Sequence, residues 1–212
     1  MQRRLFTHAL ACSAAAAPVL WPQLAQAQTA LREGSDYRRL GKPAPVEAAP
    51  GKVEVVEFFS YTCVHCYNFV PVFDNWKKSV GTDVVIKRNP VGFNASFEPL
   101  QRLYYTLEAL GKVDSHHAGV FKAIHEERQR LNTLDAMAQW AERNGIDRNQ
   151  FVQTFNSFGV AGKARRATQL QDAYEVEGTP SLGIAGRFYV PGQAARTVQI
   201  ANVLIQQARQ AA

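Results

Sequence analysis

The segment EFFSYTCVHCYNFVP, residues 57–71, holds two cysteines, Cys63 and Cys66, with only Val64 and His65 between them. Two thiols at this spacing can form a structural disulfide, bind a metal ion, or exchange disulfides with another protein. Each use makes different demands on the rest of the chain, so the surrounding sequence decides among them.

A structural disulfide is the weakest of the three interpretations. Closing so small a ring removes only about 2 kcal/mol of entropy from the unfolded chain. A chain of 212 residues can bury a sizeable core without that help.

Metal binding needs more ligands than the sequence offers nearby. A structural zinc site takes four ligands, whereas soft Cu(I) can use fewer thiolates. The chain has no second CxxC, and His116, His117 and His125 fall in a segment that favours helix, where we expect them at the surface. A copper-binding module built on the CxxC and His65 remains an alternative, although the chain has only two methionines.

Thiol–disulfide exchange fits the position of the motif best. The CxxC comes at the expected start of a helix, where free backbone N–H groups and the helix dipole stabilise a thiolate. This favours Cys63 as the exposed, reactive thiol and Cys66, one turn later, as the inward-facing thiol that resolves a mixed disulfide. His65 adds a hydrogen-bond donor or a partial positive charge, so Val64 and His65 together set the redox potential.

The expected pKa of Cys63 indicates the direction of exchange. If the helix and His65 lower this pKa from about 7 to about 4, the reduced form gains about 3.7 kcal/mol at pH 7. The potential then shifts by about 80 mV toward that of an oxidant. A thiolate this stable is a good leaving group, so we expect the motif to donate its disulfide.

The elements around the motif alternate between strand and helix. Residues 52–60, KVEVVEFFS, form a β-branched and aromatic run typical of a strand buried on both faces. Residues 67–80 have apolar residues at helical spacing and contain Pro71, which should kink the helix. Residues 83–93 favour a second strand, so the CxxC lies at the turn from strand to helix.

A helical segment follows, and the chain then returns to strands. Four stretches within residues 97–157 favour helix and none favours strand. Residues 158–212 predict a helix, a strand, a tight Gly-Arg turn, a second strand and a final helix. We therefore predict an α/β domain built from residues 28–96 and 158–212 and interrupted by an all-helical insertion over 97–157.

The N-terminus has the pattern of a bacterial export signal. The positive MQRR start, an apolar small-residue stretch and an A-x-A site ending at Ala27 predict a signal peptide over residues 1–27, by the Sec or the twin-arginine route. Cleavage removes Cys12 and leaves the CxxC alone in an oxidising compartment, the periplasm. The net charge of +6 comes from scattered basic residues, so we expect no nucleic-acid partner.

The segment VEFFSYTCVHCYNF, the later Gly-Thr-Pro and the helical insertion together resemble periplasmic thiol:disulfide oxidoreductases of the DsbA type. The resemblance extends from about Asp36 to the C-terminus and implies a thioredoxin fold. It implies that substrate thiols attack Cys63 and that Cys66 resolves. It also implies a cis Thr179–Pro180 peptide bond that faces the disulfide and offers backbone hydrogen bonds to an extended substrate.

The resemblance assigns further roles close to the motif. Glu57 would be a buried acid of raised pKa that relays a proton for Cys66, whereas by itself it could be a partly hydrated carboxylate near a strand end. Tyr61 and Val64 are expected to contribute to a shallow apolar surface that accepts varied unfolded segments.

Two residues depart from the best-known members of this family. Val64 stands where they carry Pro, and Thr179 stands where some oxidases carry Val and where isomerases also carry Thr. We predict an exported dithiol oxidase, with an isomerase or reductase and a copper-binding module as alternatives. A peptide-binding chaperone with incidental redox activity would keep its function in a Cys63→Ala variant.

The resemblance also implies partners. Substrates would be unfolded or reduced exported proteins, and an inner-membrane, quinone-linked protein of the DsbB type would reoxidise the Cys63–Cys66 pair. Isomerases usually carry a separate dimerisation domain, for which residues 28–50 are too short, so we expect a monomer. We expect no metal and no cofactor beyond the redox-active disulfide.

Overall fold

The computed structural model describes residues 31–210, so the signal peptide predicted over residues 1–27 lies outside the described part of the chain. The sheet has five strands in the order β1-β5-β4-β2-β3. The strands are β1 Arg38–Arg39, β2 Val53–Phe59, β3 Val84–Pro90, β4 Ser181–Ile184 and β5 Phe188–Pro191. The α-helices of this part are α1 Val64–Lys77, α2 Glu98–Ala109, α3 Val113–His125, α4 Leu134–Arg143, α5 Arg148–Phe155, α6 Phe158–Ala173 and α7 Ala195–Gln210.

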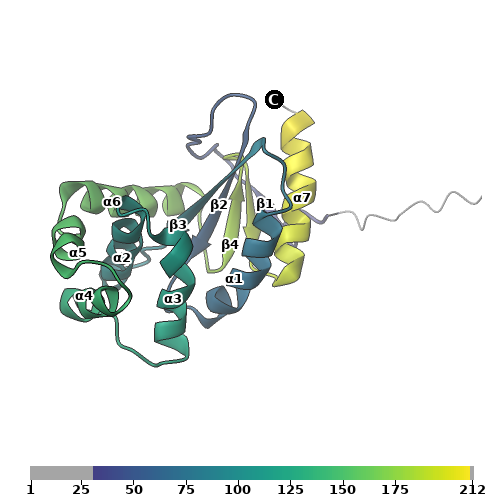
Figure 1. Cartoon of the computed structure of the whole chain (residues 1–212). Helices are drawn as coiled ribbons and strands as arrows, with labels where there is room; N and C mark the ends of the chain where they lie inside the picture. Colours follow the sequence, from purple (N-terminus) through teal and green to yellow (C-terminus); the bar gives the residue numbers. More distant parts are fainter. Residues whose placement is uncertain (1–30, 211–212) are drawn as a thin grey trace, which may run out of the picture. The chain divides into compact units, whose positions relative to one another are not determined.

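β2 is a central strand because both of its faces are covered. All seven of its residues are buried. It pairs in parallel with β3 and antiparallel with β4, so that Glu57 lies opposite Arg88 on one side and Leu182 on the other. The carboxyl ends of β2 and β3 therefore lie at the same edge of the sheet, where the CxxC begins α1 (Figure 1).

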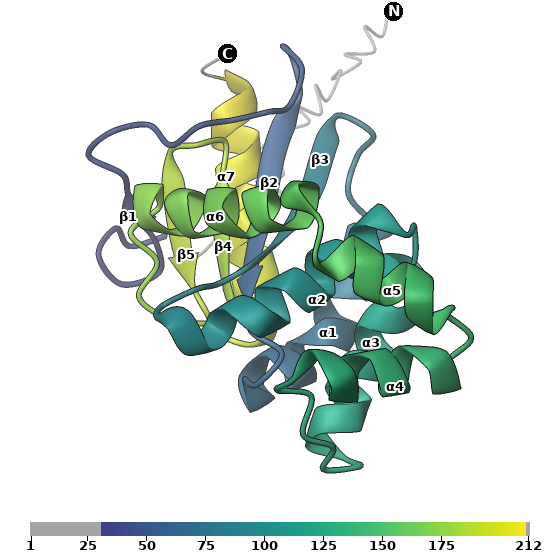
Figure 2. The ribbon, with the colours of Figure 1, turned by 90° about the vertical axis from the view of Figure 1, so that its left-hand side faces the viewer.

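Helices pack against both faces of the sheet. α1 and α7 share one hydrophobic cluster with the sheet, which includes Val55, Phe73 and Leu204. α6 lies across the opposite face (Figure 2), where Val56 packs with Tyr174 at the end of that helix. The predicted α/β fold, with strands from both parts of the chain in one sheet, is confirmed.

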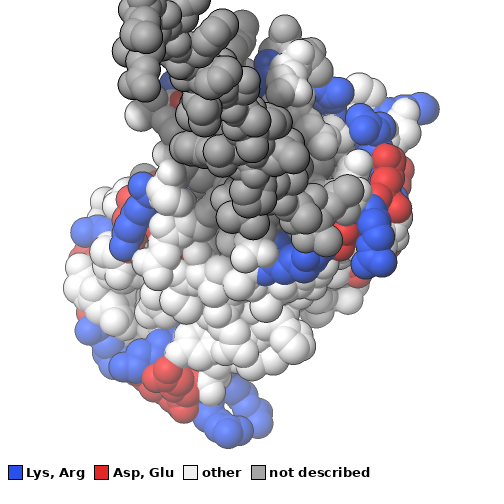
Figure 3. Space-filling model, turned by 90° about the vertical axis from the view of Figure 1, so that its right-hand side faces the viewer, with Lys and Arg blue, Asp and Glu red and all other residues white. Residues whose placement is uncertain are grey.

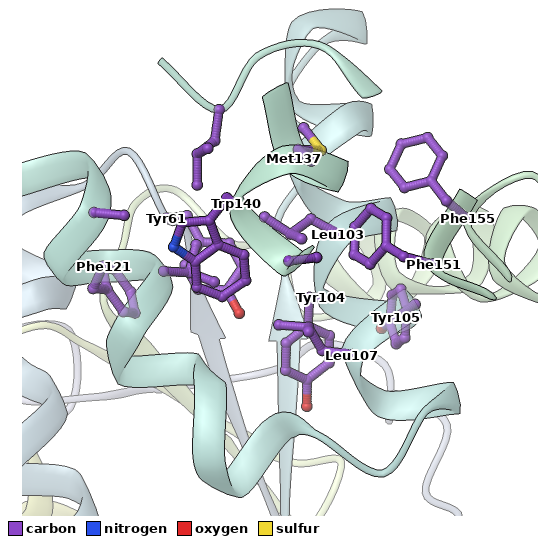
Figure 4. Packing of buried hydrophobic residues seen from close by; sticks show 14 of the residues in the cluster. Tyr61, Leu103, Tyr104, Tyr105, Leu107, Phe121, Met137, Trp140, Phe151 and Phe155 are labelled. Atoms are coloured by element: carbon purple, nitrogen blue, oxygen red, sulfur yellow. The ribbon is translucent and has the colours of Figure 1, made fainter. Parts of the chain in front are cut away.

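The segment expected to be helical, residues 97–157, contains α2 to α5 and no strand. These helices enclose a second core that includes Leu103, Trp140 and Phe151 (Figure 4). Phe59 and Tyr61, at the end of β2, belong to the same core. The helical segment therefore packs directly against the turn that carries the CxxC.

The turn between β4 and β5 lies one residue earlier than predicted. Its residues of positive φ are Ala185 at 52° and Gly186 at 65°, not a Gly-Arg pair. Two positive φ values are typical of a type I′ turn, whose twist suits a hairpin. Glycine is required at position 186 because a Cβ atom there would lie 2.5 Å from the Ala44 carbonyl oxygen.

Charged side chains of both signs are mixed on the surface. On the face in Figure 3, Lys and Arg occur beside Asp and Glu around an uncharged centre, in the part that the grey atoms leave visible. No helix within residues 31–210 has the length and apolar character needed to cross a membrane.

Candidate active site

Cys63 is the N-cap residue of α1. Its backbone is extended, with φ −86° and ψ 114°, and its Sγ atom accepts a hydrogen bond from the Cys66 N–H at 3.3 Å. A turn in which the Cys63 N–H donates to the Ser60 carbonyl at 3.1 Å leads from β2 into the helix. Both cysteines are free thiols in this structure; Cys63 is partly exposed and Cys66 is buried.

The two thiols have opposite pKa shifts. The pKa of Cys63 is lowered to about 5, mainly by a hydrogen bond from the Cys66 thiol. Hydrogen bonds from the Thr179 side chain and from the backbone N–H groups of Cys66 and His65 lower it further, whereas burial opposes the shift. The hydrogen bond to Cys63 and burial both raise the pKa of Cys66 far above its ordinary value. At neutral pH the pair therefore holds an exposed thiolate and a buried thiol.

The loop before β4 faces the reactive sulfur. The Thr179–Pro180 peptide bond is cis, as the resemblance implied. Cys63 Sγ lies 3.3 Å from the Thr179 carbonyl oxygen, to which it can donate a hydrogen bond only when it is protonated. Gly192 lets a second loop approach closely, because a Cβ atom there would lie 2.3 Å from the Pro180 carbonyl oxygen.

Val64 and His65 lie at the surface beside these groups. Val64 is 50% exposed, which agrees with the expected apolar contact surface. The contact that His65 makes with the Cys63 sulfur is through its backbone N–H rather than its imidazole. A groove of about 560 Å³ runs beside the thiols, lined by residues that include His65, Phe69, Val72, Thr179 and Pro180.

Glu57 is buried and paired with an arginine that the sequence analysis missed. Glu57 is 1% exposed, so the interpretation as a partly hydrated carboxylate is wrong. Arg88 Nε donates to Glu57 Oε2 at 2.8 Å, and the same guanidinium also pairs with Asp74 on α1. Burial raises the pKa of Glu57, while the Arg88 charge opposes that rise. Arg88 could have been noticed because two adjacent charged residues, Lys87 and Arg88, lie inside the predicted strand, where one of them must face inward.

Tyr61 is not at the surface where we expected it. Its side chain is 1% exposed, because α3 covers it. The Tyr61 hydroxyl lies 3.0 Å from His117 Nδ1, and the Tyr61 carbonyl oxygen lies 2.9 Å from His125 Nε2. The ring of Phe121 packs edge-on against Tyr61, with the centroids 5.0 Å apart. The expectation of an exposed Tyr61 ring is therefore wrong, and Tyr61 instead anchors the turn before Cys63.

One of the histidines of α3 also lies elsewhere than expected. His117 is 3% exposed rather than at the surface, and burial lowers its pKa well below the ordinary value. His117, Phe121 and His125 are spaced four residues apart, a helical periodicity that could have revealed their common face. Within residues 31–210, no three His, Cys, Asp or Glu side chains form a group that could hold a metal ion.

Comparisons with known proteins agree with this geometry. Residues 54–201 match a protein family described as DSBA-like thioredoxin domain. The thiol:disulfide interchange protein DsbA of Bordetella parapertussis is 45% identical over 188 residues, which cover 89% of this chain and 87% of that protein. The protein of the same name from Pseudomonas aeruginosa is 36% identical over 183 residues, which cover 84% of this chain and 86% of that protein.

Solved structures show the same likeness. The crystal structure of Pseudomonas aeruginosa DsbA has a TM-score of 0.81 at 35% identity and covers 87% of this chain and 97% of that one. The crystal structure of oxidoreductase DsbA from Xylella fastidiosa has a TM-score of 0.80 at 29% identity and covers 85% of this chain and 98% of that one.

Proposed function

The chain belongs to the family of DsbA-like thioredoxin domains and is a thiol:disulfide oxidoreductase; on that premise we propose that it oxidises reduced, unfolded proteins in the periplasm through Cys63. The observation that carries this proposal is the contrast between the two thiols. The pKa of Cys63 is lowered to about 5, whereas that of Cys66 is raised. A low-pKa, accessible thiolate beside a buried partner is the arrangement that thiol exchange requires.

The reaction proceeds in two displacements. A substrate thiolate attacks Cys63 Sγ of the disulfide form, the Cys63–Cys66 bond breaks, and its electron pair goes to Cys66, which takes up a proton. A second substrate thiolate then attacks the substrate sulfur of the mixed disulfide, and Cys63 leaves as a thiolate. The substrate gains one disulfide, and the enzyme leaves with both cysteines reduced.

The stability of the Cys63 thiolate gives the reaction its direction. Relative to a thioredoxin-like pKa of about 7, a pKa of about 5 stabilises the reduced form by about 2 kcal/mol at pH 7, or about 50 mV. Because Cys63 is partly exposed, solvent screening makes this an upper bound. The shift is smaller than the one expected from the sequence but has the same sign.

The loop at Thr179–Pro180 and the adjoining groove bind the substrate in this proposal. The Thr179 carbonyl oxygen lies 3.3 Å from Cys63 Sγ, and the thiolate that Cys63 forms at neutral pH has no proton to donate to it. When Cys63 is in a disulfide, that carbonyl is free for a backbone N–H of an extended substrate segment. Val64, half-exposed beside the thiols, supplies apolar contact.

We propose that Glu57 acts in the proton transfer to Cys66 and that Arg88 holds the carboxylate in place. Support comes from the burial of Glu57 and from the raised pKa of Cys66, which must gain a proton whenever the disulfide opens. The ion pair fixes the orientation of the carboxylate, because Arg88 is held from its other side by Asp74.

The cellular context is part of the proposal. We propose export through the signal peptide of residues 1–27, a monomeric enzyme that needs no metal or added cofactor, and reoxidation by an inner-membrane, quinone-linked protein of the DsbB type. We also propose that residues 28–96 and 158–212 form the thioredoxin-like domain and that residues 97–157 are the insertion. The interleaving of strands from both ends of the described chain supports this division.

The decisive test combines the Cys63 pKa with oxidase activity. The mature, reduced protein is titrated by thiolate absorbance near 240 nm, and the oxidised protein is mixed with a reduced, unfolded two-cysteine protein. A pKa near 5 together with stoichiometric disulfide transfer supports the proposal, and Cys63→Ser should abolish the transfer. A pKa at or above about 7, the thioredoxin value, with no transfer, contradicts it.

A further inference from the structure

A second groove runs along β3, with Glu54 and Val56 of β2 also in its lining, and shares no residue with the groove beside the thiols. Its volume is about 530 Å³, within the range of roughly 300–1,000 Å³ typical of ligand sites. Residues 86–89 of β3 form one side, and Tyr104 and Tyr105 of α2 belong to its lining. The end of α1 and the start of α3 line it from one face of the sheet, and α6 and the loop at residues 45–47 from the other.

The side of β3 that faces this groove has free backbone groups. In the part of the chain that the structure describes, β3 is the last strand of the sheet, and only β2 pairs with it. The Val53 N–H donates to the Asp83 carbonyl, and the Val91 N–H donates to the Phe59 carbonyl. In a parallel ladder the residues facing the partner alternate, so positions 83, 85, 87, 89 and 91 face β2. Ile86 and Arg88 therefore present their N–H and C=O groups to the open edge of the sheet, and both residues line the groove.

The free edge has defined ends. The Val84 N–H already donates to the Gly81 carbonyl at 3.0 Å. At the other end Pro90 has no N–H, and its carbonyl accepts a hydrogen bond from Gln101 Nε2 at 3.0 Å. The available edge thus runs from the Val84 carbonyl to the Arg88 carbonyl, which is long enough for a short added strand.

Two buried tyrosines direct unpaired hydroxyl groups to this groove. Tyr104 is 4% exposed and Tyr105 is 7% exposed, and both line the groove. Among residues 31–210 neither hydroxyl has a hydrogen-bond partner, and neither oxygen is fully enclosed. Buried tyrosine hydroxyls usually find a partner, so these two are available to a ligand.

Ion pairs within residues 31–210 account for all but one of the cations that line the groove. Lys87 pairs with Glu47 and Glu54, and Lys163 pairs with Glu108. Lys77 and Arg88 are likewise paired, with Asp114 and Asp74 among their partners.

Arg166 on α6 lines the groove and has no ion-pair partner within residues 31–210. Its charge is close enough to Tyr105 to influence the pKa of that hydroxyl. An acidic side chain would therefore complete this end of the groove.

We propose that this groove binds an extended polypeptide segment, which adds to the free edge of β3 as a further strand and places an acidic side chain against Arg166. Backbone hydrogen bonds to Ile86 and Arg88 give affinity that depends little on sequence, as in other cases of strand addition. The source of the segment rests on the proposed function: a reduced, unfolded substrate offers such strands, and a second contact far from its cysteine raises its effective concentration at Cys63.

Binding is tested with the cysteine-free peptide acetyl-Thr-Val-Glu-Val-Thr-amide and the mature protein labelled with ¹⁵N. Because the peptide has no thiol, its binding is independent of disulfide exchange. We expect saturable changes in the NMR chemical shifts of the Ile86 and Arg88 backbone amides. These changes should exceed those at Val85 and Lys87, whose N–H groups face β2. Shifts confined to the loop at residues 178–180, or no saturable shift, would overturn the proposal.

The cation is tested with a matched pair of variants. Arg166→Gln removes the free guanidinium from the groove, whereas Arg165→Gln removes the neighbouring exposed cation of the same helix, which is not part of the lining. We expect Arg166→Gln to weaken binding by up to about fivefold, the upper end of the range for an exposed ion pair, and Arg165→Gln to leave it unchanged. The peptide with Gln in place of Glu should bind the native protein more weakly by the same factor. The Arg166→Gln variant should bind the Glu and Gln peptides equally well.

A failure of binding at the groove can be distinguished from a failure of the proposed oxidase function. Oxidation of a short dithiol peptide by Arg166→Gln should equal that by the native protein, whatever the outcome at the groove. Equal weakening by both arginine variants, or equal affinity for the Glu and Gln peptides, would show non-specific charge attraction and overturn the assignment of the acidic side chain. Free glutamate that produces the same shifts would reduce the site to an anion contact and overturn strand addition.

Discussion

His125 Nε2 and the carbonyl oxygen of Tyr61 lie 2.9 Å apart, so the last turn of α3 hydrogen-bonds the peptide two residues before the reactive cysteine. The His125 ring also stacks on Tyr67 of α1, with a centroid separation of 5.3 Å and an interplanar angle of 4°. α3 therefore contacts the turn before Cys63 and the helix after it. The geometry of the active-site turn depends on the helical segment as well as on the sheet.

Replacing His125 should alter the pKa of Cys63. His125→Phe keeps an aromatic ring beside Tyr67 but removes the hydrogen bond to Tyr61, which contributes roughly 0.5–1.5 kcal/mol. If that bond holds the turn in place, the backbone N–H groups of His65 and Cys66 move away from the sulfur. The pKa of Cys63 should then rise by up to about one unit, measured by absorbance near 240 nm.

His116→Phe is the matched control for this change. His116 is partly exposed on the same helix, and its Nε2 atom lies 3.0 Å from the Asn144 carbonyl instead. The control should keep the native Cys63 pKa. An unchanged Cys63 pKa in a well-folded His125→Phe variant would show that α3 does not position the turn.

The lowered pKa of Cys63 predicts how the stability of the reduced form depends on pH. The folded-state pKa is about 5 and the ordinary value is 9.0. A depressed pKa contributes stability that is fully present above the unfolded value and is lost as the pH falls through the folded value. The reduced form should therefore gain stability between about pH 5 and pH 9, by at most about 1.4 kcal/mol per unit and less because solvent screens a partly exposed sulfur.

Denaturant unfolding of the reduced protein measures this effect. The free energy of unfolding is compared with that of Cys63→Ser between pH 4 and pH 8. The difference between the two proteins should be smallest at pH 4 and should widen steadily with pH. A difference independent of pH would mean that the Cys63 thiolate is not stabilised in the folded state.

Removing Arg88 should cost more stability than removing Glu57 and Arg88 together. Arg88→Met leaves the Glu57 carboxylate buried without its partner, which costs about 3–5 kcal/mol for a pair of this kind. The double variant Glu57→Leu/Arg88→Met removes both charges and should recover part of that loss. Urea unfolding measures both variants, and Lys78→Met, at an exposed position of the same charge, should change little. A double variant as unstable as the single one would argue against an unpaired carboxylate as the cause.

Much of this architecture follows from the sequence, but the contacts between distant segments do not. The apolar run of β2 and the cap at Cys63 are local features, so the strand, the helix and the thiol at its start could be predicted. The burial of Tyr61 depends on α3, more than fifty residues later, and an aromatic residue beside a CxxC looks the same whether or not a helix covers it. The Glu57–Arg88 pair depends on the register between β2 and β3, which a hydrophobic pattern alone does not fix.

Gly183 should not accept a side chain. It lies in β4, where a Cβ atom would approach Tyr174 Cε1 to 2.4 Å. Tyr174 cannot easily move, because its ring is fully buried and its hydroxyl accepts a hydrogen bond from the Gly186 N–H at 2.9 Å. Gly183→Ala should therefore destabilise the protein by about 1–3 kcal/mol, as overpacking does in other cores.

Thermal unfolding of Gly183→Ala is compared with that of Gly159→Ala. Gly159 lies in the first turn of α6, where the nearest atom to an added Cβ is Ser157 Oγ at 3.8 Å. Because alanine is a better helix former by up to about 1 kcal/mol, this control should be neutral or slightly stabilising. Equal stability of the two variants would mean that the space beside Tyr174 is not tightly packed.

A substitution at Val64 distinguishes the effect of helix geometry on the Cys63 pKa from the effect of the side chain at position 64. It is the first residue of α1, a position that favours proline because its N–H needs no helical partner. The backbone N–H groups that lower the pKa of Cys63 belong to His65 and Cys66, and Val64→Pro leaves both in place. The pKa of Cys63 in Val64→Pro should therefore stay within about one unit of its native value, equivalent to less than about 1.4 kcal/mol. A larger change, measured by thiolate absorbance and by the equilibrium constant with glutathione, would show that Val64 itself sets the redox potential.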